Sequence, residues 1–417
     1  RYGVPKDLMY LIDMCHQNQI GVIFDWVPGH ICKDAHGLYF FDGEPLYEYN
    51  DYHIRENEVW GTVNLDLGKG ITRSFLISNA MFWMQYFHCD GFRIDAVSNI
   101  VYYLGDQSKG TNTGAVDFLK QLSYTIKQKD ASVLLMAEDS TTFPKMTYPV
   151  SDGGIGFDFK WNMGWMNDTL KYFEKDPVYR KYHHDLITFG MVYAYSEKFI
   201  LPLSHDEVVH GKHSLINKMP GDYWQKFANF RTLIGLQFTH PGKKLLFMGG
   251  EFAQMHEWKD KDELEWFLLQ YPLHERANRF VRDLIQVYNH HKALYEMDHQ
   301  PEGFSWIDAS NREQSVFSFV RYAHDPNDFC IVVLNMTPNA YEEFSIGVPK
   351  MGLYEELLNS DKDIYGGSNV FNGLPLQAKK EPMHQREFSI TLKVAPLSIT
   401  ILEFRSGEGL FESEVIK

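Results

Sequence analysis

Cysteine is scarce in this sequence. Only four are present among 417 residues, Cys15, Cys32, Cys89 and Cys330, and no two form a CxxC pair. Disulfide frameworks and zinc ribbons both need cysteines at short, repeated spacings, so neither is indicated. The pattern favours a reducing compartment, and we predict a cytoplasmic protein.

Long apolar runs are also missing. The longest, such as residues 81–87, are interrupted and far shorter than the roughly 20 residues of a membrane-spanning helix. Hydrophobic residues make up 44% and charged residues 23%, close to the average for globular proteins. This composition argues against disordered, collagen-like and coiled-coil chains, and the length suggests one large domain with a smaller one.

Positive charge is in deficit. Lys and Arg total 40 against 55 Asp and Glu, which gives a formal charge of −15. A surface of this sign repels nucleic acid and anionic lipid. We therefore expect no nucleic-acid partner and no membrane partner, whereas the oligomeric state is left open.

The sequence does contain short apolar segments that alternate with helical patterns. One helical pattern begins at Pro5, with Leu8, Leu11 and Ile12 on one face, and others cover residues 76–87 and 118–126. Six segments between such patterns are typical of buried parallel strands. They are residues 20–25, 91–95, 133–138, 157–161, 200–205 and 244–249.

The pattern changes near residue 304. Residues 315–322, 329–335, 387–394 and 397–404 have the spacing and flanking turn residues of antiparallel strands. We therefore predict two domains, an α/β catalytic domain over residues 1–300 and an all-β sandwich domain over residues 301–417.

Six parallel strands are compatible with a doubly wound sheet or with a (β/α)8 TIM barrel that lacks its first two strands. No glycine-rich turn of the dinucleotide or phosphate type follows any strand. Acidic and histidine side chains instead follow the strands, and in a barrel those strand ends meet at the mouth where the chemistry occurs. The barrel is therefore favoured.

Asp95 ends the segment GFRID, and the period of two places Arg93 on the same face of the strand. The pair could be a structural ion pair, or Arg93 could keep Asp95 ionised and nucleophilic. Glu138 ends the apolar segment VLLMA, where burial is expected to raise its pKa and suit it to donate a proton. A capping or loop carboxylate is the structural alternative.

Asp206 follows the apolar segment LPL and lies beside His205. Nearby histidine and acidic side chains make a metal site a second interpretation, but their spacing differs from HExxH and we expect no metal. These side chains are His205, Asp206, Glu207, His210 and His213.

Three carboxylates at strand ends, with His and Arg beside them, suit acid, base and nucleophile chemistry on a neutral polar substrate. Cleavage of glycosidic bonds is the leading class, since it needs one protonated and one ionised carboxyl group. No GxSxG elbow and no phosphate loop is present for acyl or phosphoryl transfer.

Four ordered motifs resemble those of the α-amylase superfamily in its glycogen branching enzyme form. They are DWVPGH (25–30), GFRIDAV (91–97), AEDST (137–141) and LPLSHDEVVHGK (201–212). Flanking segments such as KWNMGWMNDTL (160–170) and HPGKKLLFMGGEF (240–252) are similar to that family as well, so that the resemblance covers nearly the whole chain.

The resemblance implies a retaining mechanism without a cofactor. Asp95 would be the nucleophile, Glu138 the general acid and base, and Asp206 the carboxylate that orients the sugar hydroxyls. Four further residues would bind the sugar: Asp25, His30, Arg93 and His205. The substrate would be an α-glucan such as glycogen or amylose as donor and acceptor, in which an α-1,4 bond is cut and an α-1,6 branch is made.

Two features depart from the family. Many α-amylases carry Asn before the first-motif His, where it binds calcium, and Gly29 here has no side-chain oxygen. The family also has an N-terminal β-sandwich and two barrel strands upstream. Without them we expect unpaired strand edges, exposure of Leu8, Leu11, Leu284 and Ile285, and a chain that is insoluble or molten and is inactive.

Other functions remain open from the residues alone. The alternatives are a hydrolytic α-amylase or neopullulanase-like enzyme and a catalytically silent glucan-binding relative. Trp161 and Trp165 could stack on glucose rings, but a core position is at least as well supported for both.

Overall fold

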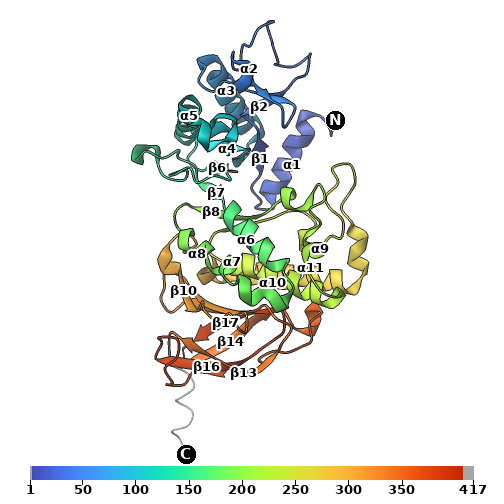
Figure 1. Ribbon diagram of the computed structural model, residues 1–417, viewed down its shortest axis with the longest axis vertical. Coiled ribbons are helices and arrows are strands. Elements are labelled where there is room, and N and C mark those ends of the chain that lie inside the picture. Colours follow the sequence, from blue (N-terminus) through green and yellow to red (C-terminus); the bar gives the residue numbers. More distant parts are fainter. Residues whose placement is uncertain (1, 407–417) are drawn as a thin grey trace, which may run out of the picture. The chain divides into compact units, whose positions relative to one another are not determined.

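The computed structural model describes residues 2–406, which form two compact units (Figure 1). Of the described residues, the first unit comprises 2–163 and 197–200, and the second comprises 164–196 and 201–406. Residues 407–417 of the predicted C-terminal domain lie outside the described part, and the boundary at residue 300 stays a prediction. Within residues 2–406 none of the helices combines the length and apolar character that crossing a bilayer requires.

The first unit is built on a parallel sheet. Its strands are β1 (Ile23–Trp26), β5 (Gly91–Ile94), β6 (Leu134–Ala137), β7 (Phe159–Trp161) and the start of β8 (Phe199–Leu203), in this spatial order. Each pairs in parallel with the next, so that Asp25 lies opposite Arg93 and Arg93 opposite Met136. The predicted strands at residues 20–25, 91–95, 133–138, 157–161 and 200–205 are therefore confirmed, with bounds shifted by a few residues.

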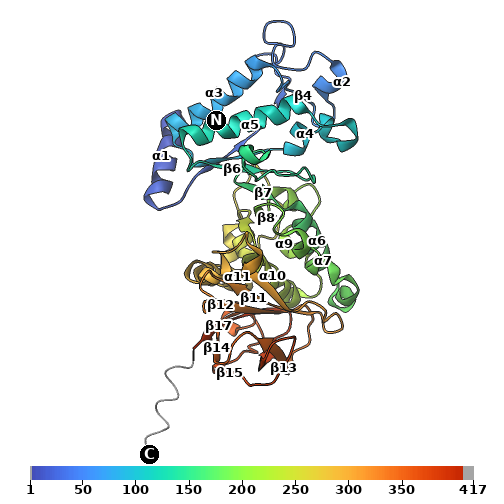
Figure 2. The same ribbon diagram turned by 90° about the vertical axis from the view of Figure 1, so that its left-hand side faces the viewer.

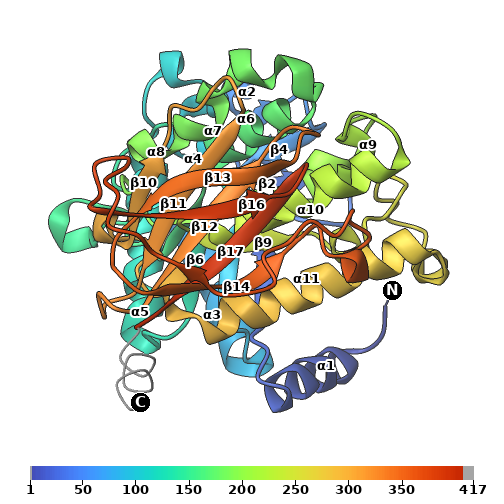
Figure 3. The same cartoon turned by 90° about the horizontal axis from the view of Figure 1, so that it is seen from below.

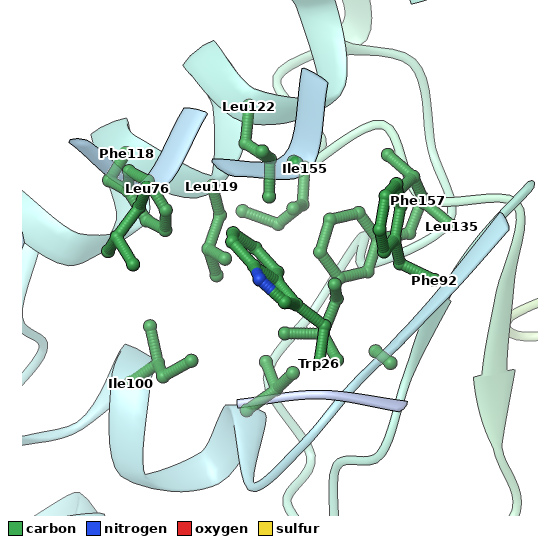
Figure 4. Close-up of a cluster of buried hydrophobic side chains, with 14 of the residues drawn as sticks. Trp26, Leu76, Phe92, Ile100, Phe118, Leu119, Leu122, Leu135, Ile155 and Phe157 are labelled. Carbon is green, nitrogen blue, oxygen red and sulfur yellow. The ribbon is translucent and has the colours of Figure 1, made fainter. Parts of the chain in front are cut away.

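Helices cover the outer face of this sheet. They are α1 (Pro5–Gln17), α3 (Gly70–Phe87) and α5 (Thr113–Lys129), and Figure 2 shows α3 and α5 running beside one another. The apolar faces of α3 and α5 meet Phe92 of β5 and Leu135 of β6 in one buried cluster around Trp26 (Figure 4). This packing explains the helical spacing of apolar residues in 76–87 and 118–126.

Shorter elements connect the strands of the first unit. A three-stranded antiparallel sheet in the order β2 (His30–Cys32), β4 (Thr62–Asn64) and β3 (Glu56–Asn57) follows β1, with α2 (Tyr52–Arg55) between β2 and β3. Helix α4 (Val97–Val101) follows β5. Sequence patterns did not predict this small sheet, because two- and three-residue strands are too short to show a period.

The second unit contains the end of β8, its neighbour β9 (Lys243–Leu246) and several helices. Strand β9 confirms the sixth predicted segment, residues 244–249. The helices are α6 (Met163–Phe173), α7 (Asp185–Thr188), α8 (Gly190–Tyr193), α9 (Leu215–Lys218), α10 (Tyr223–Thr239) and α11 (Pro272–His290).

Two antiparallel sheets complete the second unit. The larger has the order β10 (Phe304–Asp308), β11 (Val316–Tyr322), β12 (Phe329–Asn335), β17 (Ser398–Arg405), β14 (Leu353–Asn359) and β15 (Leu376–Gln377). The smaller pairs β13 (Tyr341–Val348) with β16 (Phe388–Val394), and Figure 3 views the strands of both sheets from below. An all-β C-terminal part was therefore predicted correctly.

The larger sheet is buried on both faces. Ile331 and Val333 of β12 share a core with Ile346 of β13 and Ile390 of β16. On the opposite face, Thr232 of α10 donates a hydrogen bond to the Leu397 carbonyl. Burial on both sides explains why residues 329–335 form a continuous apolar run instead of an alternating one.

The expected exposure of Leu284 is wrong. Leu284 is fully buried, because α11 packs on α10 and contacts β14. Leu11 and Ile285 are exposed and Leu8 is half-buried. The periodic apolar face of α11 therefore has a partner within the second unit, which local sequence patterns did not identify.

The core of the first unit predicts a stability difference within one helix. Phe118 of α5 is fully buried in the cluster of Figure 4, whereas Tyr124 of the same helix is exposed. We expect Phe118→Ala to lower the free energy of unfolding by about 3–5 kcal/mol through lost burial and a residual cavity. Tyr124→Ala, the matched control, should change it by about 0.5 kcal/mol or less. Urea unfolding measures both, and similar losses would contradict the core position of Phe118.

Candidate active site

Three predicted site residues lie at the carboxyl ends of neighbouring parallel strands. Asp25 is in β1, Asp95 directly follows β5, and Glu138 directly follows β6. The register places Asp25 opposite Arg93, and the period of two then places Asp95 on the same face. The first unit thus brings its predicted acidic site residues together at the carboxyl ends of the parallel strands, as the sequence predicted.

The guanidinium of Arg93 contacts all three carboxylates. Its Nη1 atom lies 2.7 Å from Oδ1 of Asp25 and 2.5 Å from Oδ1 of Asp95, and Nη2 lies 3.5 Å from Oε2 of Glu138. The Arg93 side chain is only 9% exposed, and its guanidinium lies 4.7 Å from the ring centre of Trp161. Burial lowers the pKa of Arg93, but the three carboxylates outweigh this effect and raise it. Arg93 is therefore a permanent cation here.

Asp95 is held in its ionised form. Burial by itself raises the pKa of this carboxyl group. The imidazole of His30, whose Nε2 lies 3.9 Å from Oδ2, and the guanidinium of Arg93 outweigh burial, so the pKa of Asp95 falls below its ordinary value of 3.8. An ionised carboxylate that is 26% exposed suits a nucleophile that must contact substrate.

Glu138 has different surroundings. The Ala96 amide donates a hydrogen bond of 2.6 Å to its Oε2, and the side chain is 16% exposed. Ala96 adopts a left-handed φ of 48°, which is uncommon for a residue other than glycine and costs of order 1 kcal/mol or more. This strained residue lies between Asp95 and α4, so the backbone itself directs an amide at Glu138. The expected rise of the Glu138 pKa stays a prediction.

His30 is placed by the small sheet β2-β4-β3. Its ring centre lies 4.8 Å from that of Trp60, a half-exposed indole. A Cβ atom at the preceding residue, Gly29, would come within 3.2 Å of Ile100 Cγ1, so the backbone approaches α4 closely at this point. Within residues 2–406 no group of three or more His, Cys, Asp or Glu side chains is arranged to hold a metal ion. The absence of a metal cofactor stays a prediction.

His205 and Asp206 belong to the second unit. They begin the 3-10 turn η5 (His205–Val208), one residue after the end of β8, and His205 Nε2 lies 3.4 Å from Asp206 Oδ1. Glu207 is buried, and its carboxylate accepts hydrogen bonds of 2.6 Å from both the amide and the hydroxyl of Ser204. Ser204 and Glu207 therefore form a capping box at the start of this turn. The neighbouring Asp206 side chain is 47% exposed.

The first unit thus brings together five of the seven predicted site residues, namely Asp25, His30, Arg93, Asp95 and Glu138. Trp161 and Trp165 are both buried, in agreement with the core position that the sequence analysis set against stacking on glucose rings. Sequence patterns had not assigned roles to Trp60, Trp161 as the support of Arg93, or Glu207. The signal that could have identified such residues in the sequence is a charged or aromatic residue next to a motif at the end of a strand.

The fold is that of the α-amylase type. An α-amylase from Geobacillus thermoleovorans, solved with acarbose, superimposes with a TM-score of 0.66 at 14% identity, over 97% of this chain and 82% of that one. A pullulanase from Paenibacillus barengoltzii, solved with maltohexaose and α-cyclodextrin, gives a TM-score of 0.69 at 17% identity, over 96% and 61%. Residues 306–405 match the family described as the C-terminal all-beta domain of alpha amylase.

In sequence, the chain is similar to 1,4-alpha-glucan branching enzymes. It is 55% identical to 1,4-alpha-glucan branching enzyme GlgB of Bacillus cereus strain AH187 over 402 residues, which is 96% of this chain and 62% of the relative. It is 54% identical to GlgB of Bacillus subtilis strain 168 over 409 residues, which is 98% of this chain and 65% of the relative. The chain thus spans a little under two thirds of the length of these relatives.

The contact between Arg93 and Asp95 predicts pH-dependent coupling. Because the pKa of Asp95 is lowered on folding, its carboxylate stabilises the fold above the ordinary value of 3.8, and this contribution is lost as pH falls through the folded-state pKa. A double-mutant cycle of Arg93→Met and Asp95→Asn, followed by urea unfolding, should give a coupling of about 0.5–3 kcal/mol at pH 7. The coupling should stay constant down to about pH 5 and shrink below that. Coupling that is absent at neutral pH, or unchanged in acid, would contradict this electrostatic account.

Proposed function

We propose that this chain carries the active site of a 1,4-α-glucan branching enzyme. The reaction cuts an α-1,4 bond of a glucan donor and joins the released chain through an α-1,6 bond to an acceptor glucan. The observation that supports it most directly is that two carboxylates, those of Asp95 and Glu138, contact the same guanidinium of Arg93 and differ in their other contacts. The close relatedness to branching enzymes over nearly the whole chain points to transfer as the outcome.

The first half of the reaction forms a covalent intermediate. Glu138 gives its proton to the glycosidic oxygen while the ionised Asp95 attacks the anomeric carbon of the donor. The bond from that carbon to the leaving oxygen breaks with its electron pair on the oxygen, which takes the proton. The glucan left on the enzyme is then an ester of Asp95, and Glu138 is ionised.

The second half reverses these roles. Ionised Glu138 takes the proton from the 6-hydroxyl of the acceptor, whose oxygen attacks the anomeric carbon and displaces the Asp95 carboxylate. Two inversions at the same carbon give net retention. Arg93 contacts both carboxylates, so it can stabilise Asp95 as it is released and Glu138 while it is ionised.

The remaining site residues would bind sugar. Asp25 is 59% exposed at the end of β1, which leaves one carboxylate oxygen for a hydroxyl group while Arg93 binds the other. His30 and His205 would donate to hydroxyl oxygens, and Asp206 would orient hydroxyl groups of the bound glucose toward the distorted transition state. No cofactor enters this scheme, and its acids, bases and nucleophile are all side chains of this chain.

Hydrolysis is the second candidate, because the fold is shared with an α-amylase and a pullulanase. Water would then replace the acceptor hydroxyl in the second half of the reaction. Glycogen or amylose would be the substrate in either case.

All four cysteines are free thiols, which agrees with the proposed location in a reducing cytoplasm.

Iodine staining and reducing-end assays distinguish the candidates. We expect the full-length protein to lower the iodine stain of amylose with few new reducing ends, because each cut chain is rejoined. Debranching of the product with isoamylase should release short chains. A fall in stain with many new ends would instead establish hydrolysis, and no change in either would leave only glucan binding.

Removing the nucleophile should abolish turnover. We expect Asp95→Ala to lower the branching rate by at least about 10³-fold, because no covalent intermediate can form. Amylose binding through the other residues should persist. Asp117→Ala, at an exposed position of α5, is the control and should keep full activity. A rate for Asp95→Ala within tenfold of the parent would refute the assigned role.

A further inference from the structure

Strand β7 carries no residue that the proposed mechanism uses, yet it contains a charged side chain in a buried position. Lys160 pairs with Ala137 of β6, and Ala137 belongs to the buried cluster between the sheet and the helices. Trp161, the residue after Lys160, faces Arg93. Adjacent residues of a strand face opposite sides, so Lys160 lies on the outer face of the sheet. Its side chain is only 6% exposed. A buried lysine requires partners, and its partners show what it does.

Those partners follow Glu138 directly in the chain. The ammonium group lies 2.9 Å from Oδ2 of Asp139 and donates a hydrogen bond of 2.7 Å to the Thr141 carbonyl. Oδ1 of Asp139 accepts bonds from the Thr141 amide, at 3.0 Å, and from its hydroxyl, at 2.9 Å. The Asp139 side chain is fully buried. One lysine therefore closes the turn that begins at the residue after Glu138.

This turn limits where the Glu138 carboxylate can lie. On its N-terminal side, Glu138 is fixed by the ladder bond from its amide to the Ile94 carbonyl, at 3.0 Å. On its C-terminal side, the only charge that contacts Asp139 in the described residues is Lys160. Proton transfer needs donor and acceptor within hydrogen-bond reach, so a small backbone shift at Asp139 would move the acid away from the glycosidic oxygen.

We propose that Lys160 is a positioning residue for Glu138, acting through Asp139 from the outer face of the sheet. This inference rests on the role of Glu138 in the proposed function. It assigns β7 a part in the reaction on both faces, because Trp161 contacts Arg93 on the inner face and Lys160 fixes the turn on the outer face.

The dependence of the rate on the leaving group tests a positioning role. A maltooligosaccharyl fluoride donor loses fluoride without acid assistance, whereas an α-1,4 glucan needs a proton from Glu138. The initial burst of fluoride measures formation of the intermediate on Asp95 alone. A general loss of structure lowers the rates with both donors, whereas a misplaced acid lowers only the rate with glucan.

Four variants of the full-length protein supply the comparison. Lys160→Met and Asp139→Asn should each lose about 10²-fold on amylose and less than about fivefold in the fluoride burst, whereas Lys160→Arg should recover part of the amylose rate. Asp139→Asn keeps the shape and an acceptor oxygen, so the test does not depend on the folding of Lys160→Met. The matched control is Lys127→Met, since Lys127 binds Asp158 at 2.8 Å just before β7. It should affect both donors equally.

Glu138→Gln serves as the reference. If it shows the leaving-group split and the Lys160 and Asp139 variants lose equally on both donors or on neither, the positioning role is overturned while the proposed function stands. If Glu138→Gln shows no split, the assignment of the acid itself fails. A split in all three variants, with partial recovery in Lys160→Arg, supports the proposal.

Discussion

A single buried guanidinium determines how the acidic residues of the first unit can coexist. Three carboxylates converge within hydrogen-bond or ion-pair distance of Arg93, and this cation offsets their mutual repulsion. Burying that cation is costly by itself, so it needs charged partners on one side and a supporting surface on the other. The Trp161 ring supplies this surface and excludes water from that side. His30 then adds to the effect of Arg93 at Asp95 and helps to keep that carboxylate ionised.

The parallel sheet makes this convergence possible. Each strand contributes the residue at its carboxyl end, and the register sets which side chains share a face. Neighbouring strands in the order β1, β5, β6 and β7 supply Asp25, Asp95, Glu138 and the supporting Trp161. The left-handed Ala96 adds an amide where a side chain could not reach. The carboxylates and the side chains that support them are thus different residues on adjacent strands.

Much of this arrangement could be predicted from local patterns, and the exceptions have physical causes. The apolar runs that end in Asp95 and Glu138 identified both strands and their terminal carboxylates, because a buried strand must be apolar and its end need not be. The partner of Leu284 and the two contacts of Lys160 are set by residues distant in sequence, so no local period reveals them. The strands of the β2-β4-β3 sheet are too short to alternate. His30 was therefore identified by its motif and not by its strand.

Bond cleavage and acceptor choice depend on different parts of such a site. In the proposed mechanism, Asp95, Glu138 and Arg93 would act in the same way whether water or a sugar hydroxyl completes the second step, because in both cases the acceptor gives a proton to Glu138 and the same ester bond breaks. A glucan acceptor can compete with water only if it is bound beside the anomeric carbon at a high effective concentration. Residues that hold the acceptor chain must therefore decide between branching and hydrolysis.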